Sequence, residues 1–175
     1  MIKIFVANKT DYPNSTALIQ SILQEKFGEK NYQICKTEHG KPYLKGVERK
    51  SAKYLSVSHT KEKYFIAFSP FEIGIDAEDL SREVNYSTVL KKFNETERAK
   101  VQNVSDFLAI WTAKESVVKY LGSTLSKDLK NIAVDNGCVT FCEEKLPVRI
   151  KHFQKFGHIL SVCLERETSV QFERL

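Results

Sequence analysis

Carboxylates and lysines are grouped in two short stretches of this chain, Gly74-Ile75-Asp76-Ala77-Glu78 and, further along, Trp111–Gly122. In an extended strand the side chains alternate between two faces, so Gly74, Asp76 and Glu78 are predicted to share one face. The missing side chain of Gly74 would leave room beside the two acids. Two neighbouring carboxylates repel each other unless one is protonated or a cation lies between them, and oxygen ligands favour magnesium. For this stretch alone, a solvated polar strand edge is the favoured interpretation, because Asp-x-Glu is a common pattern.

The second stretch is predicted to be helical, and one row of its apolar face contains a carboxylate. At steps of three and four, this row reads Leu108, Trp111, Glu115, Val118, Gly122. Lys114 interrupts the neighbouring row in the same turn, and Lys119 follows Glu115 by one further turn. Because burying an unpaired charge is costly, such a cluster lies at the edge of the apolar face, is paired internally, or holds a ligand. An ordinary ion pair between Glu115 and Lys119 remains an alternative.

Gly-Ile-Asp-x-Glu followed by Trp-x-x-Lys-Glu-x-x-x-Lys-x-x-Gly resembles the two signature motifs of the 4′-phosphopantetheinyl transferases, particularly the monomeric, surfactin-activating type. Two shorter motifs of that type precede them in the same order. Gly40-Lys41-Pro42 resembles the Gly-Lys-Pro loop, and Ser56-Val57-Ser58-His59 resembles a strand that ends in Ser-His. The segment 93–98 is similar to the one before the Trp-x-x-Lys-Glu helix. Four ordered motifs between Cys35 and Gly122 argue against coincidence.

The resemblance implies an enzyme that moves the 4′-phosphopantetheine arm of coenzyme A to a serine of an acyl or peptidyl carrier protein. Adenosine 3′,5′-bisphosphate is released. Carried over by position, Asp76, Glu78 and Glu115 would bind Mg²⁺ against the pyrophosphate. Glu115 would also orient or deprotonate the serine, and Lys119 would stabilise the negative charge that develops on the phosphate.

The same resemblance implies that Lys41, His59 and Lys114 contact the phosphates of coenzyme A, with His59 on the 3′-phosphate. A turn containing glycine and proline, or a histidine at a strand end, is also common in ordinary loops. The roles of Lys41 and His59 therefore depend on the other motifs. Because the region before the first motif is short, the grip on the adenosine phosphates is unassigned, and Lys36 and Lys45 are candidate substitutes.

The chain also departs from the pattern after the helix. Many relatives have a second glycine there, whereas this chain reads Gly122-Ser123-Thr124-Leu125. The loop is therefore predicted to differ in shape.

The composition of the 175 residues, with 27 Lys and Arg against 22 Asp and Glu, gives a formal net charge of +5. This charge suits an acidic carrier protein, and the dispersed lysines argue against a nucleic-acid partner. The N-terminus lacks the pattern of a signal peptide, and no apolar run is long enough to span a membrane, so we expect a cytoplasmic protein without membrane association. The four cysteines, without Cys-x-x-Cys spacing, are predicted to be buried, reduced thiols: Cys35, Cys138, Cys142 and Cys163.

Apolar periodicity and turn residues predict an α+β chain of one compact unit with two similar halves, about 1–80 and 81–175. The predicted strands cover 1–7, 31–36, 54–59, 63–69, 72–77, 131–135, 138–143, 146–151, 158–166 and 169–174. A helix is predicted over 14–27, capped by Asn14 or Ser15 and ended by Gly28. Helical segments are predicted over 85–121, the long one capped by Ser105. Hairpin turns are predicted at Thr60-Lys61-Glu62 and Asp135-Asn136-Gly137. The resemblance further implies a pseudo-dimer of two α+β halves with the active site between them, acting as a monomer.

Two other functions stay open. One is a non-catalytic module that binds coenzyme A or a carrier protein. The other is an unrelated α+β protein whose acids are structural. The intact set of three carboxylates favours the enzyme.

Overall fold

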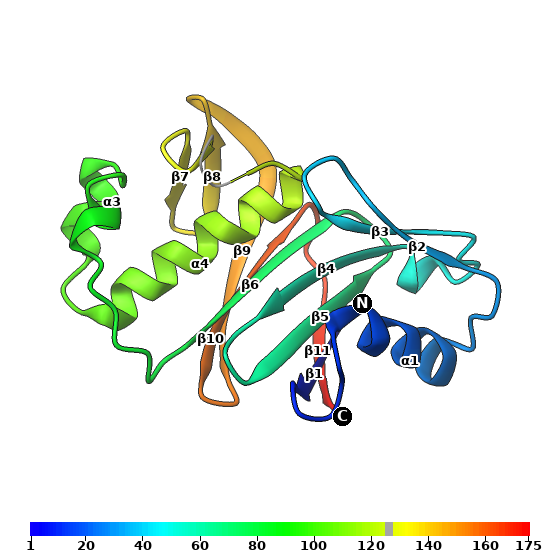
Figure 1. The fold of residues 1–175 in the computed structure, drawn as a ribbon. Helices are drawn as coiled ribbons and strands as arrows, with labels where there is room; N and C mark the ends of the chain where they lie inside the picture. Colours follow the sequence, from blue (N-terminus) through cyan, green and yellow to red (C-terminus); the bar gives the residue numbers. More distant parts are fainter. Residues whose placement is uncertain (125–127) are drawn as a thin grey trace. The chain divides into compact units, whose positions relative to one another are not determined.

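The computed structural model describes residues 1–124 and 128–175 and divides the chain into two units. The first unit contains residues 1–73 and 167–175, and the second contains residues 74–166. Each combines a sheet with at least one packed helix, so the predicted mixed α+β class is confirmed (Figure 1). The division differs from the predicted halves, because residues 74–80 belong to the second unit and the last strand to the first. The pseudo-dimer and the single compact unit stay predictions.

The first unit is built on a four-stranded sheet in the order β11-β1-β5-β4. Its strands are β1 (Ile2–Asn8), β4 (Tyr54–His59), β5 (Lys63–Ser69) and β11 (Val170–Arg174). β1 pairs in parallel with β11 and antiparallel with β5, which in turn pairs antiparallel with β4. A separate hairpin joins β2 (Gln33–Lys36) to β3 (Pro42–Lys45), and β3 was not predicted. A short 3₁₀ helix covers Lys50–Ala52.

Helix α1 (Ser15–Phe27) supplies the apolar face that packs against this sheet (Figure 1). It begins where the side chain of Asn14 accepts a hydrogen bond from the Ala17 amide, and it ends at Gly28, with φ of 68°. Both ends agree with the prediction. The core that they hold together includes Phe5, Leu18, Ile22, Leu23, Phe27, Ile66 and Phe68.

The second unit is built on a five-stranded sheet in the order β6-β10-β9-β8-β7. The strands are β6 (Ile73–Asp79), β7 (Ile132–Asp135), β8 (Cys138–Phe141), β9 (Glu144–Lys155) and β10 (His158–Leu164). Helices α2 (Ser87–Leu90), α3 (Glu95–Lys100) and α4 (Val104–Leu121) precede β7, and α4 lies along the sheet (Figure 1). The predicted helical segments over 85–121 are therefore confirmed. The loop predicted to differ in shape includes Leu125, which lies outside the described residues.

Two predicted turns are confirmed and one predicted cap is wrong. β7 and β8 are joined by Asn136 and Gly137, both with positive φ, and the Thr60 amide donates to the Lys63 carbonyl between β4 and β5. The cap of α4 is Asn103 rather than Ser105, because its backbone is extended and its side chain accepts from the Asp106 amide at 3.0 Å. The chain therefore enters the helix before Ser105 is reached.

The cysteines are free thiols, but they are not all buried as predicted. Cys163 is buried in β10, Cys35 and Cys138 are partly buried, and Cys142 is exposed. Cys142 lies in the turn between β8 and β9 with φ of 50°, so its side chain projects from a hairpin end instead of a sheet face. In the described part of the chain, we find no helix both long enough and apolar enough to cross a membrane.

Candidate active site

Gly74 lets helix α4 lie against strand β6. A Cβ atom at this position would lie 1.9 Å from the carbonyl oxygen of Ser116 and 2.5 Å from the amide nitrogen of Tyr120. Any side chain would therefore collide with the helix backbone. The open space predicted beside the acids is wrong, because the helix itself fills it. The close approach instead carries the acids of β6 alongside the charged turn of α4.

Asp76 of β6 and Lys119 of α4 form the most direct link between these two elements. The Lys119 ammonium donates to Asp76 Oδ1 at 2.7 Å, and the exposed fractions of the two side chains are 28% and 8%. Asp76 is thus nearly buried, beside a partner that solvent still reaches. The structure brings these two predicted site residues together.

Glu78, one strand step beyond Asp76, pairs with an arginine that the sequence analysis did not select. The Arg82 guanidinium donates to Glu78 Oε2 at 2.6 Å, and Arg82 is 51% exposed against 16% for Glu78. The sequence did contain a signal for Arg82. It lies four residues after Glu78, where a turn after the strand can return its side chain to the acids.

Glu115 shares the electrostatic environment of both pairs. The pKa of Glu115 is raised to about 8, mainly by burial and then by the neighbouring charges of Asp76 and Glu78, while Lys119 and Arg82 act in the opposite direction. Three carboxylates and two cations therefore form one interacting group, which we call the acidic cluster: Asp76, Glu78, Arg82, Glu115 and Lys119. Its carboxylates outnumber its cations, as a site that receives a cation would require.

The acidic cluster suits a divalent metal by its chemistry but does not form a ready cage. Three neighbouring carboxyl groups supply the oxygen donors that Mg²⁺ prefers. Among residues 1–124 and 128–175, however, no three His, Cys, Asp or Glu side chains lie close enough together to hold an ion. Lys119 and Arg82 are placed on two of the carboxylates instead. The magnesium site at Asp76, Glu78 and Glu115 stays a prediction.

Lys114 precedes Glu115 in α4, but its ammonium lies in the interior. It pairs with Glu97 at 2.9 Å, and both side chains are only 1% exposed. The ammonium also donates to the carbonyls of Leu129 and Ile132 and lies 5.2 Å from the centroid of the Phe93 ring. Burial lowers the pKa of Lys114 and the Glu97 carboxylate raises it. With its donors turned to protein groups, Lys114 is not placed to contact coenzyme A, and that expectation is corrected here.

Glu97 is the residue of this region that sequence reasoning missed. Its carboxylate closes the capping box of α3 with Asn94 and accepts from the Val134 amide of β7 at 2.9 Å. The signal was present as Asn-x-x-Glu at the start of a helix. Trp111 packs against an apolar cluster that includes Phe93 and Phe107, and its ring is stacked 6.0 Å from that of Phe107.

A model of the 4′-phosphopantetheinyl transferase superfamily matches residues 72–163, a range that includes the whole acidic cluster. This chain belongs to that superfamily. The family predicted from the motifs is thereby confirmed. A curated relative, the 4′-phosphopantetheinyl transferase gsp of Aneurinibacillus migulanus, is 30% identical over 144 residues, covering 76% of this chain and 58% of the relative. The chain thus spans less than two thirds of that relative's length.

Lys41 and His59 lie before the range that the superfamily model matches, in the first unit. Gly40 has φ of 81°, and the Lys41 amide donates to the Thr37 hydroxyl at 3.1 Å, so the predicted Gly-Lys-Pro turn is present. The Lys41 ammonium pairs with Glu72 at 2.5 Å and is 15% exposed. The predicted contacts of Lys41 and His59 with coenzyme A stay predictions.

His59 ends β4 and is exposed at the surface of the first unit. Its Nδ1 lies 3.4 Å from the Lys9 ammonium, and its ring meets Tyr64 edge-on with centroids 6.4 Å apart. The Lys9 ammonium also lies 5.3 Å from the centroid of the Tyr64 ring. Lys9, which directly follows β1, therefore adds a cation beside His59 that no motif indicated.

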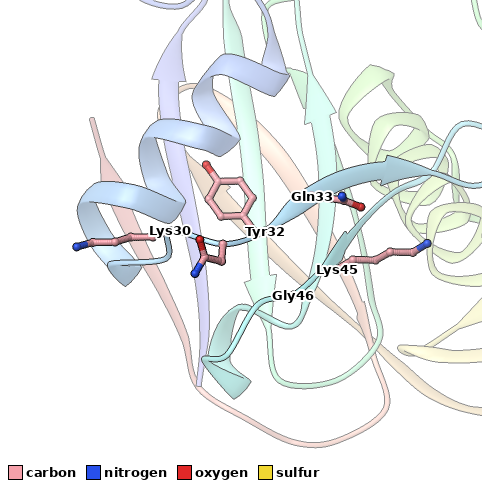
Figure 2. A pocket seen from close by; sticks show the side chains of 6 residues that line it. Lys30, Tyr32, Gln33, Lys45 and Gly46 are labelled. Atoms are coloured by element: carbon pink, nitrogen blue, oxygen red, sulfur yellow. The ribbon is translucent and has the colours of Figure 1, made fainter.

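A hollow of about 570 Å³ lies elsewhere on the first unit, lined by Lys30, Asn31, Tyr32, Gln33, Lys45 and Gly46. Gly46 lets two parts of this lining approach closely, because a Cβ there would lie 2.6 Å from the Asn31 carbonyl oxygen. Figure 2 shows the side chains of Lys30 and Lys45 leading away from each other, so the two cations do not converge on one anion. Lys45 was a candidate phosphate contact, and this hollow gives it no partner for that role.

Proposed function

We propose that this chain transfers the 4′-phosphopantetheine arm of coenzyme A to a serine of an apo acyl or peptidyl carrier protein, with Mg²⁺ as the cofactor. The observation that carries the proposal is the acidic cluster. Three carboxylates and a lysine, separated in sequence, are gathered by β6 and α4 inside the matched range. A structural role alone would not require three carboxylates beside only two cations, because an acid buried among other acids destabilises the fold.

In the proposed reaction, the serine oxygen of the carrier forms a bond to the phosphorus that bears the pantetheine arm. The bond from that phosphorus to the bridging oxygen breaks, and adenosine 3′,5′-bisphosphate leaves with the electron pair. Asp76, Glu78 and Glu115 would hold Mg²⁺, which supplies neutralisation of the diphosphate charge when it is bound. Glu115 would orient the serine hydroxyl and take its proton, directly or through water. Lys119 would donate to the phosphate oxygens once it leaves Asp76.

Lys41 and His59 would bind the remaining phosphates of coenzyme A, with His59 on the 3′-phosphate, as the motifs imply. Lys114 has no part in this proposal. The net charge of +5 supports an acidic carrier as the protein partner, because opposite charge speeds encounter and fixes orientation. A monomer acting in the cytoplasm completes the proposal.

A second candidate is a non-catalytic module that binds coenzyme A or a carrier protein. It is favoured by one observation, namely that Lys119 and Arg82 are paired with carboxylates that would otherwise be metal ligands. Such a module would bind coenzyme A without any dependence on Mg²⁺.

The test is intact-mass spectrometry of apo acyl, peptidyl and aryl carriers incubated with this protein, coenzyme A and Mg²⁺. The proposal predicts a gain of one phosphopantetheine mass with the unchanged protein and none with Asp76→Ala or Glu115→Ala. The exposed pair of α3 offers a control, since Arg98→Ala should retain full transfer. No gain with any carrier, together with Mg²⁺-independent binding of coenzyme A in calorimetry, would establish the binding module instead.

A further inference from the structure

Arg82 lies outside both signature motifs, yet its guanidinium forms an ion pair with Glu78, a carboxylate of the acidic cluster. The nitrogen-to-oxygen distance between Arg82 and Glu78 is 2.6 Å, and that between Lys119 and Asp76 is similar, at 2.7 Å. Two of the three carboxylates are thus neutralised by the protein's own cations.

The position of Arg82 is fixed by a built turn. The Asp79 carboxylate accepts from the Ser81 amide at 2.8 Å and from the Ser81 hydroxyl at 2.7 Å. The Arg82 amide donates to the Asp79 carbonyl at 3.1 Å, and the Leu80 amide donates to the Gly157 carbonyl at 3.0 Å. The chain therefore reverses directly after β6 and returns Arg82 to the strand it has just left. The backbone at Arg82 stays next to the cluster even when its side chain moves.

The two internal pairs differ in how readily they open. Arg82 is 51% exposed, whereas Lys119 is 28% exposed and its partner Asp76 only 8%. An ion pair with half of its arginine in water is weak, because water and salt compete for both charges. The Glu78 pair should therefore open before the Asp76 pair when a stronger cation arrives.

We propose that Arg82 neutralises Glu78 until a divalent cation takes that carboxylate, and that the released guanidinium then binds the diphosphate of coenzyme A. This inference rests on the proposed function. A guanidinium matches phosphate oxygens with two parallel hydrogen bonds, which an ammonium cannot do. Since the turn holds Arg82 beside the cluster, the released side chain needs only a rotation to reach a diphosphate bound there.

Competition for Glu78 makes two opposite predictions for one substitution. Without coenzyme A, Arg82 and Mg²⁺ exclude each other at Glu78, so Arg82→Gln should bind Mg²⁺ about 3- to 10-fold more tightly than the unchanged protein. With saturating Mg²⁺, Arg82 contributes to the diphosphate, so Arg82→Gln should bind coenzyme A about 5- to 10-fold more weakly.

Isothermal titration with MgCl₂ alone, and then with coenzyme A in excess MgCl₂, measures both effects on the full chain. Arg98→Gln is the matched control, because Arg98 forms an exposed pair with Glu95 at 3.8 Å in the same unit, and it should leave both affinities unchanged. Arg82→Lys should retain the competition with Mg²⁺ but lose part of the coenzyme A affinity. Circular dichroism spectra that overlay with those of the unchanged protein verify folding.

The inference is overturned if Arg82→Gln leaves Mg²⁺ affinity unchanged or weakens it. It is equally overturned if Mg²⁺ binds more tightly but coenzyme A binds as before, because Arg82 would then be a counter-ion only. These failures are distinguishable from failure of the proposed function. In that case the unchanged protein itself would show no Mg²⁺-dependent binding of coenzyme A, and the inference would fall with it.

Discussion

Two neighbouring residues of α4, Lys114 and Glu115, belong to charged groups of opposite design. Lys114 is 1% exposed and meets one carboxylate, that of Glu97, and two carbonyls, so its charge is fully compensated. Glu115 lies among other carboxylates, and its pKa rises to about 8. The first group connects α3, α4 and β7, whereas the second places Glu115 where its ionisation is unfavourable, at some cost to the fold. A compensated charge indicates a structural role, and an uncompensated one indicates a place for a ligand.

The largest effect should come from breaking the compensated group. Glu97→Ala leaves the Lys114 ammonium buried without a counter-ion, and we expect a loss of about 3–5 kcal/mol in the free energy of unfolding. Urea denaturation followed by circular dichroism measures this change. Glu95→Ala is the control in the same helix, because Glu95 is 94% exposed and its removal should cost less than about 0.5 kcal/mol. Equal unfolding midpoints for Glu97→Ala and Glu95→Ala would contradict a structural role for the Lys114–Glu97 pair.

Separating α4 from β6 should disturb the uncompensated group more than the compensated one. Gly74→Ala places a methyl group against the backbone of Ser116 and Tyr120, and we expect roughly 1–3 kcal/mol of destabilisation or more. Gly40→Ala is the comparison, since no atom lies within 4 Å of that Cβ and only its positive φ is unfavourable. If the two variants melt at the same temperature, the close approach at Gly74 does not hold the helix.

Neutralising Glu115 should stabilise the metal-free protein while abolishing the proposed transfer. The raised pKa of Glu115 means that the folded state resists ionisation, so folding stability should fall as pH rises from about 4.5 to 8. Glu115→Gln should remove this part of the pH dependence and raise the melting temperature at pH 8, by roughly 2–4 °C for each 1 kcal/mol gained. Thermal melts in EDTA across this pH range provide the measurement. A slope that persists in Glu115→Gln would contradict the assignment of the raised pKa.

The smallest effect on stability should come from the start of α4, the helix that carries both Lys114 and Glu115. Asn103→Ala removes the cap at the Asp106 amide and should cost about 1 kcal/mol. Ser105→Ala, by contrast, should change the unfolding midpoint little, because Ser105 already lies within the helix. A larger loss of stability in Ser105→Ala than in Asn103→Ala, measured by urea denaturation, would support Ser105 as the cap instead.

Local patterns carried much of the prediction. The extent of α1 followed from Asn14 and Gly28, because each end is a short-range hydrogen-bonding preference. The apolar row of α4 placed Glu115 on the helix face that packs inward, and burial is the main cause of its raised pKa. β3 was missed because a four-residue strand between turns leaves little periodicity to detect.

Long-range pairing could not be predicted from the same patterns. Lys114 was expected to contact a ligand because the sequence does not show that Glu97, from another helix, meets its ammonium. Gly74 was interpreted as open space because nothing local indicates that the backbone of α4 would fill it. Arg82 was overlooked because its partner is set by a side-chain-stabilised turn rather than by strand or helix periodicity.

The parallel pairing of β11 with β1 has a consequence for synthesis of the chain. The second unit is continuous in sequence, whereas the first is completed only when residues 167–175 return to it. On the ribosome, residues 74–166 are all translated before β11 is available, so β1 must wait with one edge unpaired. The slowest step of folding is then expected to be the docking of β11, which joins the most distant parts of the sequence.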